Sequence, residues 1–306
     1  MRRRIKQLLK TLIKPALGLG LLALLIAQLE PEKIRTTIAT IQWHWFIAAI
    51  GLLSVSQALS ARRWQIISAT LGLAISYRQA LKVYIQGLAM NTVLPGGIVT
   101  GDAWRTLHLS KTGDKKKAVS SVFLDRYSGF LALGLLSLLA IASDVSGFSQ
   151  SAGQSKIMLY GLCLIAILIS PIIVQLVIRD THSCLKAAFI HSVAIQVFAI
   201  SSFYCCIRSL DTPGLTIGYL GVMAACAGIF LSSVVPASIG GFGARELGAV
   251  AFLSPLGISP EISFTASFLF GLAGTFIGAA GSLTWIKNRR TAQADPVAQA
   301  VQKKNG

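Results

Sequence analysis

The chain is interrupted twice by proline and glycine inside sequence that is otherwise apolar enough for a membrane. The first interruption lies within residues 93–105 and the second within residues 234–246. The prolines and glycines are Pro95, Gly96, Gly97 and Gly101 in the first, and Pro236, Gly240, Gly241 and Gly243 in the second. In lipid, a broken helix leaves backbone groups unpaired, so such breaks persist only inside protein or beside a water-filled cavity. A corresponding pair of breaks in two halves of a chain points to a transporter-type binding site.

The composition is that of an integral membrane protein. Hydrophobic residues make up 54% of the 306 residues, and the mean hydropathy is +0.67. No stretch is long and polar enough to form a soluble domain, so we expect no soluble synthase or glycosyltransferase domain here. The net charge of +17 lies at the ends of apolar segments, where it orients helices and meets anionic lipid. We therefore expect membrane lipids, and not nucleic acid, as partners.

The sequence shows no pattern for a cofactor, a metal ion or a catalytic centre. The five cysteines have no Cys-x-x-Cys spacing, and the four histidines have no paired-ligand spacing. The glycines of the second break follow no predicted strand, unlike those of a nucleotide-binding fingerprint. We therefore expect buried thiols, no cofactor, no direct use of ATP and no enzymatic activity.

Six apolar segments are long enough to cross a bilayer, which takes roughly 17–25 residues. They are residues 12–29, 45–61, 118–142, 157–178, 187–206 and 262–285. Each broken region, about 80–110 and 216–256, is predicted to be a hairpin that returns to the side it came from. The predicted fold class is therefore an all-α polytopic membrane protein with six transmembrane helices and two re-entrant hairpins.

Lysine and arginine residues set the orientation of such a chain, because they favour the cytoplasmic side. With a retained first transmembrane helix, a cytoplasmic N-terminus and two hairpins, most of them fall on that side. They include Arg62 and Arg63 as well as the clusters Lys115–Lys117 and Lys287–Arg290. If residues 216–235 instead crossed once and residues 262–285 crossed back, the last cluster would lie outside. We therefore predict a multi-pass protein of the cell (inner) membrane with both termini in the cytoplasm.

This topology divides residues 1–290, a single membrane domain, into two inverted halves, about 10–145 and 155–287. Residues 291–306 are predicted to be a disordered cytoplasmic tail. An inverted repeat places the substrate site near the middle of the membrane, and rocking of one half against the other gives alternating access.

Three sets of acidic and basic residues lie in or beside apolar sequence, where ionisable groups are costly and usually functional. They are Asp102 with Arg105, Asp125 with Arg126, and Arg245 with Glu246. Asp102 and Arg105 are three residues apart and share a helix face. Asp125 and Arg126 are adjacent and point apart, so each needs a partner elsewhere. We expect those partners to be the hairpin charges of the other half.

These residues have a structural and a functional interpretation. In the structural one, the ion pairs only pin the hairpins in place. In the functional one they form a phosphate site, because arginine matches phosphate with paired hydrogen bonds. Glycine-rich breaks at a helix start also present backbone N–H groups to an anion. Asn91 next to the first break adds a neutral polar group.

The residues of both breaks resemble those of the lysylphosphatidylglycerol synthase transmembrane family, over about residues 10–290. The resemblance rests on residues 91–97, Gly101 and Asp102 with Arg105, residues 124–126, and Pro236 with residues 240–246. It implies a membrane domain that handles lipid. In the aminoacyl-lipid synthases this domain is joined to a soluble transferase, so the resemblance does not imply lysyl transfer here.

Together these observations predict a flippase- or scramblase-like lipid translocase for an anionic or phosphate-bearing lipid. Arg105, Arg126 and Arg245 would bind the head group. Asp102, Asp125 and Glu246 would balance the arginines when the site is empty, and one of them would couple transport to protons. Three alternatives stay open: an intramembrane enzyme, a membrane subunit or anchor of a lipid-modifying transferase on a separate chain, and a regulatory membrane protein without turnover.

Overall fold

The computed structural model describes residues 31–93, 98–111, 113–143, 165, 167, 169–174, 182–210, 217–234 and 242–294. Within this part of the chain the protein is helical, and Ile41 and Leu210 form an isolated antiparallel β-bridge. The prediction of an all-α membrane protein is confirmed at this level.

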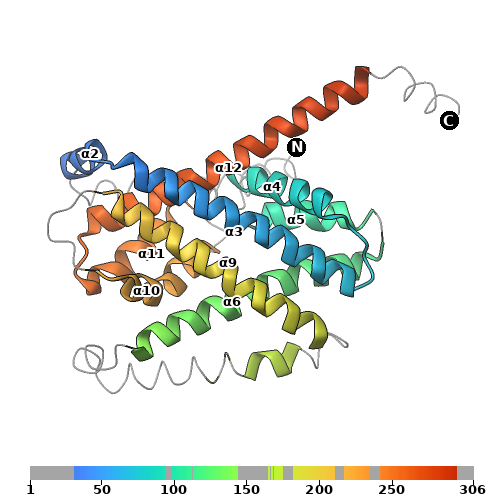
Figure 1. The fold of residues 1–306 in the computed structure, drawn as a ribbon, viewed down its shortest axis with the longest axis horizontal. Helices are drawn as coiled ribbons and strands as arrows, with labels where there is room; N and C mark the ends of the chain where they lie inside the picture. The colour runs from blue at the N-terminus through green and yellow to red at the C-terminus, as the bar shows by residue number, and fades with distance from the viewer. Residues whose placement is uncertain are drawn as a thin grey trace, which may run out of the picture.

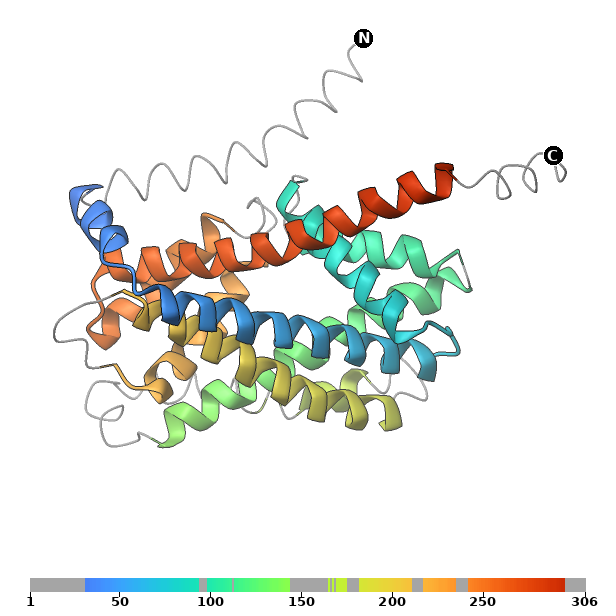
Figure 2. The same cartoon turned by 45° about the horizontal axis from the view of Figure 1, so that its top comes forward.

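Among the described residues, four helices are long and apolar enough to cross a membrane. They are α3 (Trp43–Thr70), α6 (Lys115–Ser143), α9 (His182–Arg208) and α12 (Pro260–Ala294). Figures 1 and 2 show these helices running along the length of the molecule. The shortest of them, with 27 residues, is about 40 Å long at 1.5 Å per residue. The hydrocarbon core of a bilayer is about 30 Å thick, so each helix has the length to span it.

These four helices match the predicted spans at 45–61, 118–142, 187–206 and 262–285, but each extends beyond its apolar run. A hydropathy criterion ends a span at the first charges, whereas a helix continues as far as its backbone hydrogen bonds do. The predicted span at 12–29 lies outside the described residues. The predicted span at 157–178 is described only at residues 165, 167 and 169–174, which are helical.

Both predicted breaks separate pairs of short helices. The first pair is α4 (Tyr77–Val93) and α5 (Ile98–Leu109), and the second is α10 (Tyr219–Ser232) and α11 (Ala244–Leu253). None exceeds 17 residues, or about 26 Å, so no single arm matches the bilayer core. The break residues Pro95, Gly96, Gly97, Pro236, Gly240 and Gly241 lie outside the described residues.

Each pair of short helices packs closely through glycine. A Cβ atom on Gly101 of α5 would clash with the carbonyl oxygen of Gly87 on α4, and one on Gly248 of α11 would clash with the Ser232 hydroxyl of α10. Figures 1 and 2 place the α4–α5 pair and the α10–α11 pair at opposite ends of the long helices. The two pairs therefore approach the middle of the molecule from opposite ends.

The largest core lies between α3, α9, α10, α11 and α12. Phe203 of α9 is fully buried and meets Phe230 of α10 and Phe270 of α12, with ring centroids 5.9 and 5.6 Å apart. A hydrogen bond also joins α3 and α9: the Ser202 hydroxyl donates to the Ala49 carbonyl oxygen at 2.7 Å. Small residues let membrane helices approach this closely.

Two short elements complete the described chain. Helix α2 (Pro31–Ala39) packs on α12 through Ile34, which contacts Phe264, and a 3-10 turn (Ser254–Leu256) joins α11 to α12. Three cysteines, Cys205, Cys206 and Cys226, are free and buried. This confirms for them the prediction of buried thiols.

Candidate functional site

A cavity of about 250 Å³ lies in the middle of the bundle. Its walls come from α3, α4, α5, α6, α9, α10, α11 and α12, so both short-helix pairs and all four long helices contribute. The charged side chains among its described lining residues are Arg63, Arg105, Arg126, Arg245, Asp102 and Asp125. A cavity rich in arginine at the centre of an apolar bundle is a candidate binding site.

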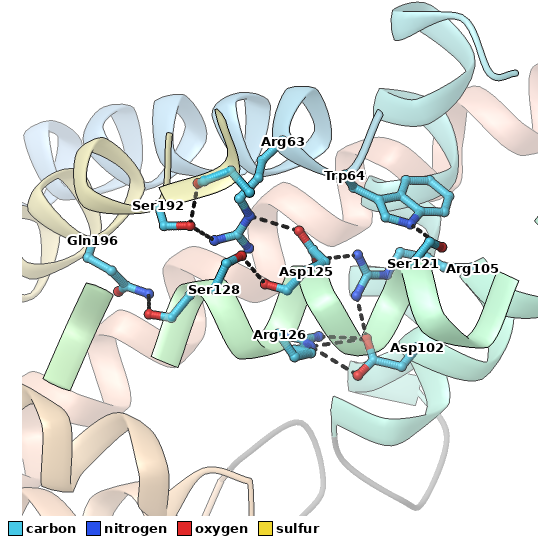
Figure 3. A network of polar contacts seen from close by, with 12 residues as sticks. Arg63, Trp64, Asp102, Arg105, Ser121, Asp125, Arg126, Ser128, Ser192 and Gln196 are labelled. Carbon is cyan, nitrogen blue, oxygen red and sulfur yellow. Dashed lines mark hydrogen bonds and ion pairs between the residues drawn. The ribbon is translucent and has the colours of Figure 1, made fainter. Parts of the chain in front are cut away.

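Asp125 is the centre of a buried ion-pair ladder, which Figure 3 shows from the side of α6. Its carboxylate is fully buried and accepts from Nε of Arg63 at 2.8 Å and from Nη1 of Arg105 at 2.7 Å. Arg63 also donates from Nη1 to the Ser192 hydroxyl of α9 at 2.8 Å. Asp125 of α6 therefore links α3 and α5, and Arg63 extends the link to α9.

Asp102 forms the other end of the ladder. Its Oδ1 accepts from Nη2 of Arg105 at 2.6 Å and from Nη2 of Arg126 at 2.8 Å. Its Oδ2 accepts from Nε of Arg126 at 2.9 Å. The order of contacts is thus Arg63, Asp125, Arg105, Asp102 and Arg126, with basic and acidic groups in alternation (Figure 3).

The two ends of this ladder differ in exposure. The side chains of Arg63, Asp125 and Arg105 are exposed by 5%, 0% and 3%, whereas those of Arg126 and Asp102 are exposed by 32% and 22%. Arg105 is further fixed by aromatic faces, since its guanidinium lies 5.3 Å from the Trp64 ring centroid and 4.7 Å from that of Tyr84. Removing either partner of a buried pair strands a charge, so losing a contact is most costly at the Arg63 end of the ladder.

Arg245 brings the second short-helix pair to the cavity. Its Nη2 donates to Oε1 of Glu246 at 2.8 Å, and its Nε donates to the Ser267 hydroxyl of α12 at 3.2 Å. The guanidinium lies against the rings of Phe242 and Phe270, 5.2 and 5.7 Å from their centroids. Arg245 is 6% exposed, so this pair is also largely enclosed.

Glu246 does not line the cavity; it holds the start of α11 together. Its Oε2 accepts from the backbone N–H of Gly243 at 2.5 Å, and Oε1 accepts from Ser267 at 3.1 Å. Gly243 has a φ of +91°, a conformation that favours glycine. The Gly243 N–H, predicted to face an anion, is therefore used inside the protein.

The first pair uses its glycine in a similar way. The N–H of Gly101 donates to Oδ1 of Asn91 at 2.6 Å, and the Thr100 hydroxyl donates to the same oxygen at 3.3 Å. Asn91 and Gly101 both line the cavity, but their contact fastens α5 to α4. Of the predicted donors in the described part of the chain, the arginine side chains are thus the ones that face the cavity.

The structure brings together most of the predicted charged residues and corrects one expectation. Asp102 and Arg105 pair within α5, as their spacing predicts. The prediction that Asp125 and Arg126 pair with hairpin charges of the other half is wrong. Their partners lie on α3 and α5, because α5 packs directly on α6, and Arg245 is already satisfied by Glu246.

Sequence reasoning missed Arg63, Ser192 and Gln196. Arg63 follows an apolar run, and this position predicts a positive charge on the cytoplasmic side. In the structure, only 4% of Arg63 is exposed. Ser192 and Gln196 lie four residues apart on α9, and Gln196 donates to the Gly129 carbonyl oxygen at 3.0 Å. Polar residues inside the apolar run 187–206 are the signal by which this face of α9 could have been found.

The fold and the cavity define a class: a multi-pass helical membrane protein with a charged site enclosed by its helices. The chain belongs to the family described as the lysylphosphatidylglycerol synthase TM region, whose model matches residues 11–187 and 176–281. This confirms the resemblance seen in both breaks and gives the protein a role related to membrane lipids. A search of individually curated proteins found no match. The family model describes a membrane region, not a catalytic domain.

Proposed function

We propose that this protein moves an anionic, phosphate-bearing lipid between the two leaflets of the cell (inner) membrane. The observation that carries the proposal is the central cavity, at which Arg126 and Asp102 are partly exposed while Arg63, Asp125 and Arg105 are buried. Membership of a family named for a lipid synthase's membrane region supports a lipid as the ligand.

The charge balance of the cavity favours an anion. Three arginines, Arg63, Arg105 and Arg126, pair with the two carboxylates of Asp102 and Asp125. The fourth arginine, Arg245, is neutralised by Glu246. Among the described residues the site therefore keeps one excess positive charge. An uncompensated charge away from water is costly, and a bound anion removes that cost. A head-group phosphate supplies one negative charge and several acceptor oxygens for arginine.

The arrangement of the short-helix pairs supports alternating access. In the proposed topology both termini are cytoplasmic, α4–α5 is a re-entrant hairpin from the cytoplasm, and α10–α11 is one from outside. The two pairs lie at opposite ends of the long helices in Figures 1 and 2. Rocking of two inverted halves would expose the cavity to each side in turn, with the acyl chains remaining in lipid.

The test is lipid movement in liposomes reconstituted with purified protein and fluorescent phosphatidylglycerol. Wild-type protein should accelerate the movement, whereas Arg126→Gln and Arg245→Gln should abolish it while still folding and inserting. The matched control is Arg78→Gln, because Arg78 is an exposed arginine at the start of α4 outside the cavity. Wild-type rates in both cavity variants would show that these arginines are structural and would refute the proposal.

The salt dependence of lipid binding distinguishes the cavity from the basic surface. Exposed charges are screened beyond about 8–10 Å at physiological salt, and enclosed ones much less. Binding to the cavity should weaken only modestly as salt rises, whereas attraction to Lys115–Lys117 should fall steeply. Binding without lipid movement would instead favour the membrane subunit of a lipid-modifying transferase.

A further inference from the structure

We infer that Asp102 is a built-in competitor for the lipid phosphate: its carboxylate occupies Arg126 in the empty site and leaves when the head group binds. This inference rests on the proposed function, because it assigns a role within the same site. It makes Asp102 a specificity-determining residue and Arg126 the residue that contacts phosphate.

The geometry of the Arg126–Asp102 pair is that of an arginine holding an oxyanion. Nε of Arg126 donates to Oδ2 at 2.9 Å and Nη2 donates to Oδ1 at 2.8 Å, so two neighbouring N–H groups meet two oxygens. Arginine uses the same paired contact for carboxylate and for phosphate. The Asp102 carboxylate therefore stands where two phosphate oxygens would bind.

The exchange is possible at this pair because it is the open end of the ladder. The side chains of Arg126 and Asp102 are 32% and 22% exposed, whereas the Arg63–Asp125 pair is 5% and 0% exposed. An anion can reach Arg126 without disturbing the buried pairs, which hold α3, α5 and α6 together.

Asp102 keeps a partner after it leaves Arg126. Its Oδ1 already accepts from Nη2 of Arg105 at 2.6 Å, and Arg105 is held by Asp125 and two aromatic rings. The displaced carboxylate therefore keeps a hydrogen-bonded partner. A buried carboxylate without a partner would oppose the exchange. Arg105 thus contacts Asp102 in both the empty and the lipid-bound site, whereas Arg126 exchanges Asp102 for the phosphate.

A tethered competitor selects among incoming anions. An anion must bind Arg126 better than a carboxylate that is already in place. Chloride is a single atom and offers no pair of oxygens to the guanidinium fork, so it loses this competition, whereas a phosphate ester offers several acceptor oxygens. A single bound phosphodiester also offsets the one excess positive charge of the cavity.

The test is Asp102→Asn, which keeps the side-chain shape and removes the competing charge. Its affinity for phosphatidylglycerol in phosphatidylcholine nanodiscs should rise about tenfold, equivalent to ~1.4 kcal/mol, and chloride should begin to compete. The matched control is Asp114→Asn, which makes the same charge change at an exposed position beside Lys115–Lys117 and outside the cavity. This control should leave affinity and chloride sensitivity unchanged.

The outcomes distinguish the two proposals. Wild-type preference for phosphatidylglycerol, with equal or weaker binding by folded Asp102→Asn, overturns the exchange and leaves the proposed function intact. The same gain in Asp114→Asn also overturns it, because surface charge would then explain the effect. Wild-type protein with no preference for phosphatidylglycerol over phosphatidylcholine overturns both.

A measurement on the wild-type protein keeps the inference testable if Asp102→Asn does not fold. In liposomes containing phosphatidylglycerol, solid-state NMR should show the lipid ³¹P nucleus close to the side-chain ¹⁵N nuclei of Arg126. The Asp102 carboxyl ¹³C resonance should shift on lipid binding, and that of Asp125 should not. A phosphorus contact at Arg245 without one at Arg126 overturns the inference.

Discussion

Arg63 on α3 donates to Asp125 on α6 at 2.8 Å, and both side chains are buried although 62 residues separate them in the sequence. The bond joins two membrane-spanning helices at the wall of the cavity. The carboxylate of Asp125 is also the acidic partner of Arg105. The stability of the helix bundle and the shape of the site thus depend on the same pair.

This relationship predicts a strong coupling between the two residues. Arg63→Met should strand the Asp125 carboxylate with only Arg105 and lower the free energy of unfolding by about 3–5 kcal/mol. Asp125→Asn should cost a similar amount. The double variant should cost less than the sum of the two, because both charges of the pair are removed together and Arg105 keeps Asp102 as its partner. Unfolding in detergent, followed by tryptophan fluorescence, measures the cycle, and additive losses would show that the pair is not coupled.

Close packing of α4 and α5 gives the second prediction. Gly101→Ala should lower the free energy of unfolding by about 1–3 kcal/mol, because its Cβ would clash with the Gly87 carbonyl oxygen and crowd Asn91. Gly51→Ala is the matched control, since Gly51 lies exposed on α3 with no atom within 4 Å of a new Cβ. Thermal unfolding of both variants measures the difference. Equal stability would mean that α4 and α5 do not touch at Gly101.

The sequence predicted the parts of this fold that depend on local signals. Four apolar runs became long helices, and both proline–glycine breaks separate short ones. The Asp102–Arg105 pair was also predictable, because it needs only helical spacing. Arg63 was not, since an arginine after an apolar run is typical of an interface, and only the packing of α3 against α6 turns it inward. The partners of Asp125 likewise depend on tertiary structure.

His108 gives a prediction for pH. It lies at the end of α5, outside the four membrane-spanning helices, and pairs with Nε2 of Gln79 at 3.1 Å. Partial burial, with repulsion from Lys111 and Lys82, lowers the pKa of His108 below its usual value of 6.5. The unfolded chain therefore binds this proton more readily, so the contribution of His108 to stability is lost as pH falls below about 6.5.

The measurement is an NMR titration of the His108 ring. Lys111→Gln should move the pKa of His108 upward, towards 6.5, because it removes a repelling charge. Lys186→Gln, on exposed α9 surface, should leave it unchanged. A wild-type pKa above 6.5 would contradict the burial and charge environment seen here.

The topology is tested by labelling two exposed positions at opposite ends of the molecule. Asp114 lies between α5 and α6, and Leu256 ends the turn after α11. If α4–α5 enters from the cytoplasm and α10–α11 from outside, Asp114→Cys should be labelled only from the cytoplasmic side and Leu256→Cys only from outside. A membrane-impermeant maleimide applied to intact cells and to inverted vesicles, in a chain without its native cysteines, gives the answer.

The physical reason for this expected labelling pattern is the lysine and arginine bias, since Lys115–Lys117 follows Asp114 directly and favours the cytoplasm. Labelling of both positions from the same side would contradict the two-hairpin topology and remove the basis for inverted halves that rock about the cavity.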